Sequence, residues 1–312
     1  MINRRHIRVK VMQSVYAMLQ SKSDNLVKEE KFLYGSIDKM YDLYAILLQL
    51  LVEVRTLEKN HLELSKKKIL ATKEELSPNT KFVNNAVLKL LFESVSLSSY
   101  IEDHKLNCWY LDVDYVKDIW KQIKLSDAYE KYMQSEQSSF QEDKEFIASV
   151  FKTIIAPSDK LADYFEGQTL SWVDDIPFVN TWVLKTINKL KLGETFILGK
   201  LYKDEDDKKY VLDLFRKTVL NHTEFEKDIE DKTPNWDTER IAEIDMILIK
   251  MAICEFLKFP SIPSRVTINE FIEISKDYST SKSSFFINGV LDKLLKEYES
   301  SKRINKIGRG LL

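Results

Sequence analysis

Basic side chains crowd the first turns of an expected N-terminal helix: Arg4, Arg5, His6, Arg8 and Lys10. Because the partial positive charge at a helix N-terminus repels cations, each of them costs typically about 0.3–1 kcal/mol there. A segment selected for stability alone would carry acids at these positions. We therefore interpret the cluster as a set of contacts to phosphate groups. The alternative is a solvated helix terminus without a ligand.

A second candidate site combines Phe285, Phe286 and Gly289. The expected helix around them has an apolar stripe at helical spacing, formed by Ile287, Val290, Leu291, Leu294, Leu295 and Tyr298. Phe286 falls on the flank of this stripe, and Phe285 falls nearly opposite it. Gly289 lies one turn after Phe285, in a helix interior where glycine costs about 1 kcal/mol relative to alanine. The pattern indicates close packing at this point, either by another helix of the same protein or by an unpaired base or a partner protein.

The sequence lacks the residue patterns that catalysis and metal binding need. The four histidines are scattered without metal-ligand spacing, at positions 6, 61, 104 and 222. Cys108 follows His104 by four residues, but a zinc site needs a second pair of ligands, which is missing. There is no glycine-rich phosphate loop and no nucleophile elbow. We therefore predict a protein that is not an enzyme, with no catalytic residue, metal or cofactor.

The composition favours an all-α protein. The chain of 312 residues is 44% hydrophobic and 31% charged and contains only 7 glycines and 6 prolines, so helix breakers are rare. It has no apolar run of the roughly 18 residues that a membrane span needs, and its charged N-terminus does not resemble a signal peptide. We therefore expect a cytoplasmic protein. Because the net charge is −2, nucleic-acid binding would depend on a local basic patch.

Helices must position both candidate sites. We expect the basic cluster on a helix over residues 3–20 that begins with an asparagine N-cap. Residues 263–295 are expected to form two helices joined by a polar break. The first would begin with a capping box between Thr267 and Glu270. The second would begin with a serine hydroxyl cap from residues 281–284.

The rest of the sequence predicts further helices and one early linker. The linker is expected at the polar residues 21–31. Amphipathic helices are expected at residues 32–64, 80–100, 113–124, 126–134, 141–154, 210–222 and 237–256, the last of them capped by Asp237. Trp172 and Trp182 are expected to anchor a core, and the acidic run at 204–207 is interpreted as a solvated loop. Asp245 interrupts an apolar helix, so it either faces water at a rim or is kept for a basic group or backbone amide of a partner.

The last two helices carry a resemblance to a known family. Residues 265–270 are Arg-Val-Thr-Ile-Asn-Glu, and residues 286–292 are Phe-Ile-Asn-Gly-Val-Leu-Asp. In this order and at this spacing, the two segments resemble the C-terminal signature of the transcription antitermination factor NusB family. The N-terminal helix resembles the arginine-rich first helix of that family at Arg4, Arg5, Arg8, Gln13 and Tyr16.

The resemblance implies an all-α, NusB-like bundle of two helical subdomains. It also implies binding of a boxA-type single-stranded RNA together with the ribosomal protein that acts as Nus factor E. The complex would join the RNA polymerase elongation complex and suppress termination in ribosomal RNA operons. Carried over to this sequence, the RNA-binding residues would be Arg4, Arg5, His6, Arg8, Ser283, Ser284 and Phe286, and the partner-binding residues would be Tyr16 and Asp245.

The sequence departs from the family pattern near the expected RNA site. His6 stands where an arginine is common, Lys282 where an acid is frequent, and Phe285 where a basic residue is frequent. One positive charge is therefore missing and another is added beside the expected RNA, which changes the expected affinity and sequence preference.

The resemblance divides the chain into three expected parts. Residues 1–20 and 205–300 would form the NusB-like core, residues 21–204 an inserted helical region, and residues 301–312 a basic flexible tail. The insertion leaves a second interpretation open: a helical protein-interaction module with weakened RNA binding, whose insertion carries the partner site. A third interpretation, a ribosomal RNA cytosine methyltransferase, is disfavoured because the sequence shows no methyl-donor-binding βαβ pattern.

Overall fold

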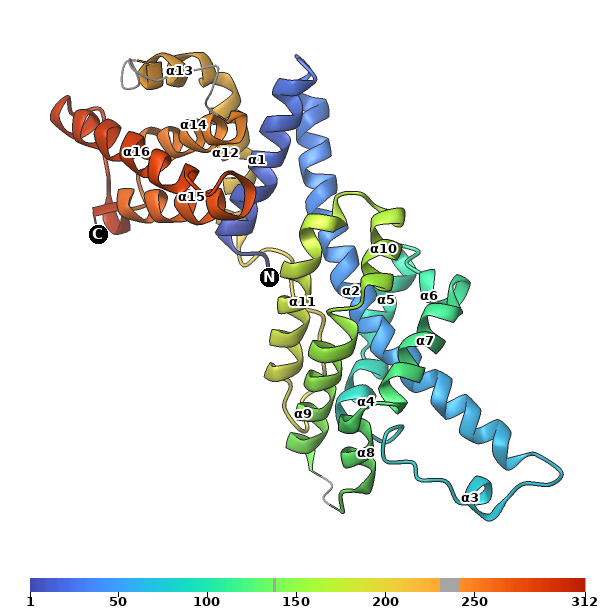
Figure 1. The fold of residues 1–312 in the computed structure, drawn as a ribbon. Helices are drawn as coiled ribbons and strands as arrows, with labels where there is room; N and C mark the ends of the chain where they lie inside the picture. The colour runs from blue at the N-terminus through green and yellow to red at the C-terminus, as the bar shows by residue number, and fades with distance from the viewer. Residues whose placement is uncertain (137–138, 231–241, 312) are drawn as a thin grey trace. The chain divides into compact units, whose positions relative to one another are not determined.

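The computed structural model describes residues 1–136, 139–230 and 242–311. Every regular element among these residues is a helix, which confirms the all-α prediction (Figure 1). The chain forms two compact units. Residues 1–37 and 200–312 form one of them, here called the terminal unit, and residues 38–199 form the other, here called the central unit.

The terminal unit contains both candidate sites. Its helices are α1 (Arg4–Gln20), α12 (Glu205–Leu220), α13 (His222–Glu230), α14 (Glu243–Lys258), α15 (Ser264–Tyr278) and α16 (Ser283–Ser300). All the other helices of this set pack against α14, and α1 also contacts α12 and α15. Every residue of α14 from 247 to 256 is buried, which explains why this helix is apolar over most of its circumference.

The central unit is a set of helices around the long α2 (Leu26–Lys66), whose first turns belong to the terminal unit. The others are α3 (Lys73–Leu76), α4 (Ala86–Phe92), α5 (Val95–Asp103), α6 (Cys108–Leu111), α7 (Val113–Lys124), α8 (Asp127–Gln134), α9 (Phe140–Val150), α10 (Asp159–Gln168) and α11 (Trp172–Lys189). The ring of Trp182 stacks on Tyr44 with centroids 4.2 Å apart, and Trp172 Nε1 donates to the Lys39 carbonyl oxygen at 2.7 Å. Both tryptophans are buried, as predicted.

Local sequence signals place some helices correctly and misplace others. The prediction at 113–124 is confirmed by α7, and Ser126 caps α8 by accepting a hydrogen bond from the Tyr129 N–H at 3.2 Å. The linker prediction for residues 21–31 is wrong at its end, because α2 already begins at Leu26. The helix expected at 80–100 is divided at Ser94, whose side chain caps α5.

The acidic run before α12 is part of the helix and not a solvated loop. Asp204 is the N-cap and accepts a hydrogen bond from the Asp207 N–H at 2.9 Å. The acids that follow lie in the first turn, where they favour the helix macrodipole. Asp207 is buried, so the prediction of a solvated loop is wrong. The predicted cap at Asp237 lies outside the described residues, and α14 begins at Glu243.

Both of the predicted caps near the family signature are wrong. α15 begins at Ser264, which leaves Thr267 and Glu270 inside the helix and not at a capping box. α16 begins at Ser283 after Lys282, which makes no side-chain capping hydrogen bond. Tertiary contacts of the same side chains replace the expected caps and are described below.

Two basic side chains of the C-terminal segment contact helices of the terminal unit. Arg303 pairs with Glu224 and Asp228, both at 3.1 Å. Lys306 Nζ donates to the carbonyl oxygens of Glu255 and Phe259, both at 3.1 Å. The second pair of contacts adds a side-chain donor to two carbonyl oxygens at the end of α14 that also accept backbone hydrogen bonds from Phe259 and Ile262. None of the described helices is long and apolar enough to cross a membrane.

Candidate nucleic-acid interface

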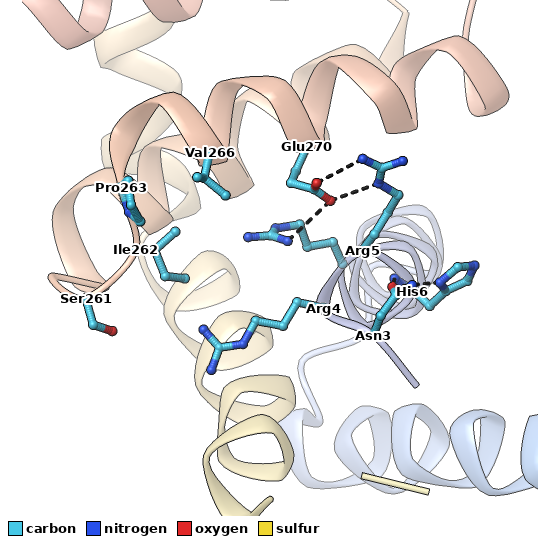
Figure 2. A pocket seen from close by; sticks show the side chains of 10 residues that line it. Asn3, Arg4, Arg5, His6, Ser261, Ile262, Pro263, Val266 and Glu270 are labelled. Atoms are coloured by element: carbon cyan, nitrogen blue, oxygen red, sulfur yellow. Dashed lines mark hydrogen bonds and ion pairs between the residues drawn. The ribbon is translucent and has the colours of Figure 1, made fainter. Parts of the chain in front are cut away.

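The N-terminus of α1 and the start of α15 border a pocket of about 570 Å³ (Figure 2). Its lining residues are Asn3, Arg4, Arg5, His6, Arg8, Ser261, Ile262, Pro263, Val266 and Glu270. Asn3 caps α1 as predicted, because its Oδ1 accepts a hydrogen bond from the His6 N–H at 3.0 Å and lies 2.8 Å from His6 Nδ1. Four residues of the predicted basic cluster, Arg4, Arg5, His6 and Arg8, therefore border this hollow of the terminal unit, whereas the fifth, Lys10, is buried and is not among the lining residues.

Arg8 is buried in an ion pair with Glu255 of α14. Its Nε donates to Glu255 Oε1 at 2.7 Å and its Nη2 to Oε2 at 3.0 Å, and the two side chains are 2% and 0% exposed. Glu255 also accepts hydrogen bonds from the hydroxyls of Tyr210 and, at 2.8 Å, of Thr267. Burial disfavours the charged form of Arg8, but the Glu255 carboxylate, together with Tyr210 and Glu270, outweighs the effect of burial and raises the pKa of Arg8.

This network sets Arg8 apart from the other arginines of the predicted RNA site. Its guanidinium is paired with Glu255 inside the protein and lies 3.7 Å from Glu270, although the residue also borders the pocket. Arg8 therefore joins α1 to α14, and its contact with a phosphate stays a prediction. The same network explains the failed capping box, because the Thr267 hydroxyl is committed to Glu255.

Arg4 and Arg5 lie at the rim of the pocket and keep much of their side chains exposed. Arg5 makes a two-fold contact to Glu270, with Nε and Nη2 each 2.9 Å from a carboxylate oxygen, and its side chain is 42% exposed. Figure 2 shows this pair on one side of the pocket and Arg4 on the other. Arg4 Nε pairs with Asp207 at 2.8 Å, and its side chain is 38% exposed. These two arginines can meet an anion from solvent, in competition with their own carboxylates.

The Arg5 pair also fixes the charge of its partner. The hydrogen bond from Arg5 is the main cause that lowers the pKa of Glu270, with the charges of Arg8 and Arg5 acting in the same direction. Glu270 therefore stays ionised at neutral pH and partly neutralises the basic cluster. An RNA phosphate that binds Arg5 has to displace the Glu270 carboxylate or share the guanidinium with it.

The start of α16 exposes one of its two phenylalanines. Phe285 is 81% exposed, whereas Phe286 is half-buried. A Cβ added at Gly289 would meet nothing within 4 Å in the described part of the chain, so none of the described helices packs against this glycine. Phe285 is thus the more exposed of the two aromatic side chains. Its position opposite the apolar stripe is the feature of the sequence that predicts this exposure.

The two serines of this turn differ in their surroundings. Ser283 is buried, and its hydroxyl accepts from the Thr280 N–H at 3.2 Å and bonds to the hydroxyls of Ser279 and Thr280. It therefore shapes the turn between α15 and α16. Ser284 is half-buried and retains some exposure at the start of α16. The structure leaves Ser284 as the better placed of the two for an external contact.

The residues predicted to bind a protein partner lie at the opposite end of α1. Gln20, at the end of α1, hydrogen-bonds Glu243 in the first turn of α14, which brings Tyr16 and Asp245 to the same end of the two helices. Tyr16 is 39% exposed. Asp245 is buried, and its Oδ1 has no hydrogen-bond partner among the described residues, so the water-facing rim interpretation is wrong.

Comparisons with known proteins agree with this helical architecture. The NusB family model matches residues 184–296. A transcription antitermination protein NusB of Salinibacter ruber is 42% identical over 112 residues, which cover 36% of this chain and 70% of that protein. A NusB of Chloroherpeton thalassium is 36% identical over 122 residues, covering 39% of this chain and 58% of that protein. No solved structure matches.

The chain belongs to the NusB family of non-enzymatic transcription antitermination factors. A third relative, a NusB of Finegoldia magna, is 39% identical over 94 residues and is covered over 69% of its own length. The family match includes α12 to α15 and most of α16 but not α1 or most of the central unit. Residues 1–183 lie before the family match.

Proposed function

We propose that this chain binds a boxA-type single-stranded RNA in ribosomal RNA operons, as an antitermination factor acting in the cytoplasm at the RNA polymerase elongation complex. The observation that carries the proposal is the pair of exposed guanidinium groups, Arg4 and Arg5, at the rim of the pocket at the N-terminus of α1. Their positive charge beside a helix N-terminus suits phosphate groups, which are attracted to both features.

The RNA backbone would meet Arg4, Arg5 and His6, and its bases would reach the start of α16. Arginine presents donors that match a phosphate, and an exposed aromatic ring offers a stacking surface of about 1–3 kcal/mol per base. Phe285 is exposed enough to stack on a base, and the bare backbone at Gly289 leaves room beside it. We therefore add Phe285 to Ser284 and Phe286 as an RNA-contacting residue.

We propose further that the ribosomal protein acting as Nus factor E binds at the other end of α1, at Tyr16 and Asp245. Asp245 supports this because its buried carboxylate oxygen has no hydrogen bond among the described residues, which is costly, and a donor from a partner would satisfy it. Tyr16 adds an exposed aromatic surface of the kind enriched at interfaces.

RNA titration at two salt concentrations tests the proposal. Replacing Arg4 or Arg5 with alanine is expected to lower the affinity for a boxA-like RNA and to reduce the salt slope by about one unit for each phosphate that the variant no longer neutralises. Arg216 is a matched control, since it is 46% exposed and ion-paired with Glu30 in the same unit but lies outside the pocket. An equal reduction of affinity in the Arg216→Ala protein would show a general charge effect and would contradict the site.

A second candidate function is a protein-interaction module with weakened RNA binding. The observation that favours it is the central unit, a compact body of residues 38–199 that lies mostly outside the family match. The ion pairs of Arg4 and Arg5 also reduce the charge available to RNA. Equal, weak binding to a boxA-like RNA and a scrambled RNA, even with the ribosomal protein present, would favour this second function.

A further inference from the structure

Arg55, on α2 in the central unit, is a buried cation. The residue is 6% exposed, and it forms no ion pair with a carboxylate of the described residues. Its Nε donates to the Val83 carbonyl oxygen at 2.9 Å, but its Nη1 is enclosed and has no hydrogen-bond partner in the described chain. Burial lowers the pKa of Arg55, because the charged form is the one that loses hydration. Such a charge is costly unless a partner compensates it.

An aromatic ring covers this guanidinium. Arg55 Cζ lies 4.8 Å from the centre of the Phe92 ring at the end of α4. The Phe92 side chain is itself 49% exposed, so it forms an outer surface over the cation. The charge of the neighbouring Glu93 acts on Arg55, but the two form no ion pair among the described residues. The guanidinium therefore lies directly beneath the Phe92 ring, and its Nη1 can still donate a hydrogen bond.

Exposed aliphatic side chains lie beside this position. Two hydrogen bonds, at 2.9 and 2.8 Å, join residues 94–96 to residues 196–198, so these segments run side by side. Val95 is 74% exposed and Ile197 is 72% exposed, while the residues before and after Ile197 are buried. Together with Phe92, they give the start of α5 a small exposed apolar surface.

We infer that this surface, the Arg55 patch formed by Arg55, Phe92, Val95 and Ile197, docks a segment of a partner protein that carries a carboxylate between apolar side chains. The carboxylate would pair with the guanidinium after the Phe92 ring moves aside, and the partner's apolar side chains would cover Val95 and Ile197. Arginine is the residue best suited to such a pair, because its planar group can bind both carboxylate oxygens at once.

The chemistry of the patch favours a protein over a nucleic acid. Single-stranded RNA is bound by several cations along its backbone and by aromatic rings that stack on bases. The Arg55 patch has one guanidinium, two aliphatic side chains that cannot stack on a base, and one aromatic ring, Phe92, which already lies over the guanidinium. It offers a single cation where a strand of RNA needs several. This inference concerns the central unit and does not depend on RNA binding by the terminal unit.

Two pools of immobilised twelve-residue peptides test the inference on the full-length protein. In one pool, each peptide holds an aspartate or glutamate between leucine and phenylalanine residues, and in the other pool the acid is replaced by asparagine or glutamine. The protein is expected to be retained at least about tenfold more strongly by the acidic pool, a difference that one well-placed charge pair can supply. Equal retention by both pools would overturn the inference.

Variants identify the surface that is responsible. Arg55→Met should abolish the preference for the acidic pool, and Ile197→Ser should weaken retention by both pools. Leu170→Ser is the matched control, because Leu170 is 76% exposed in the same unit but does not belong to the patch, and it should retain peptides like the unaltered protein. An unchanged preference in Arg55→Met would overturn the inference.

Thermal unfolding separates binding from structure. Since no carboxylate of the described residues pairs with the guanidinium, Arg55→Met should unfold within a few degrees of the unaltered protein while its preference disappears. If Arg55→Met fails to fold, the surface variants Ile197→Ser and Val95→Ser decide the question by their retention on the acidic pool. Binding of a single-stranded RNA oligonucleotide is measured as well. If Arg55→Met abolished RNA binding but not peptide binding, the inference of a protein partner would be overturned.

Discussion

The three arginines of α1 differ in burial, and we expect them to differ in role for this reason. Arg8 is enclosed with Glu255, whereas Arg4 and Arg5 keep roughly two-fifths of their side chains in solvent. A buried pair holds the core together because either charge alone would be left without compensation. An exposed pair contributes little to stability and can exchange its partner for a ligand.

Arg8→Ala is expected to lower the free energy of unfolding by about 3–5 kcal/mol, because Glu255 would remain as a buried, unpaired charge. Arg4→Ala should lower it by less than about 1 kcal/mol, since its pair with Asp207 is partly exposed. Denaturant unfolding measures both values. An Arg8→Ala protein as stable as the unaltered chain would contradict a structural role for Arg8.

Glu270→Gln is expected to strengthen RNA binding by a factor of up to about five at low salt, because removing a partly exposed pair is worth about 1 kcal/mol or less. The change frees the Arg5 guanidinium from its carboxylate. Glu224→Gln is the control, since it removes the same charge from the pair with Arg303, away from the pocket. Weaker RNA binding by Glu270→Gln would show that the carboxylate orients Arg5 and does not compete with RNA.

At the scale of elements, the turn between α15 and α16 and the C-terminal segment determine the shape of the candidate interface. The hydroxyl of Ser283 closes the turn, and α16 then presents Phe285 and the bare backbone of Gly289 to solvent. The C-terminal segment is fastened to the end of α14 through Lys306, next to the residues that lead into the pocket. Unfolding measurements test both features, and RNA titration also tests the first.

Gly289→Ala is expected to raise the free energy of unfolding by about 0.5–1 kcal/mol, because alanine favours a helix and its Cβ meets nothing within 4 Å in the described chain. The same variant should bind RNA more weakly if a base lies against this backbone. Denaturant unfolding and RNA titration of one preparation measure both effects. A decrease in stability would contradict the open surface at Gly289.

The free energy of unfolding is expected to change with pH in the alkaline range because of Lys306. Burial lowers the pKa of Lys306 from 10.5 to about 8, so the unfolded chain binds more protons than the folded chain between these values. Stability should therefore rise as the pH increases from about 8 to 10.5, and this part of the slope should vanish in Lys306→Met. Unfolding measured across that interval in both proteins checks the prediction. An identical slope in the two proteins would show that Lys306 is not responsible.

Elements with a strong local pattern can be predicted from the sequence, whereas contacts between distant residues cannot. The helix at 113–124 has a regular apolar face, and its prediction is confirmed. The capping box at Thr267 and Glu270 fails because Glu255 and Arg5 compete for the same side chains. The burial of Arg8 depends on Glu255, which lies 247 positions away, so no local signal separates Arg8 from its exposed neighbours.

At the scale of the whole chain, α1 organises the terminal unit by separating two candidate surfaces. Its 17 residues span about 25 Å at 1.5 Å per residue, with the basic pocket at its first turn and Tyr16 close to its last turn. This length allows an RNA and a protein partner to bind the same unit together. The central unit adds a separate compact body, whose Arg55 patch gives the chain a further candidate surface.

The most direct test of the account is RNA binding by the full-length protein with a boxA-like and a scrambled single-stranded RNA, with and without the ribosomal protein. We expect tight binding that prefers the boxA-like RNA, is strengthened by the ribosomal protein, and weakens as salt rises. Equal and weak binding of both RNAs in the presence of the ribosomal protein would contradict the proposed RNA-binding function.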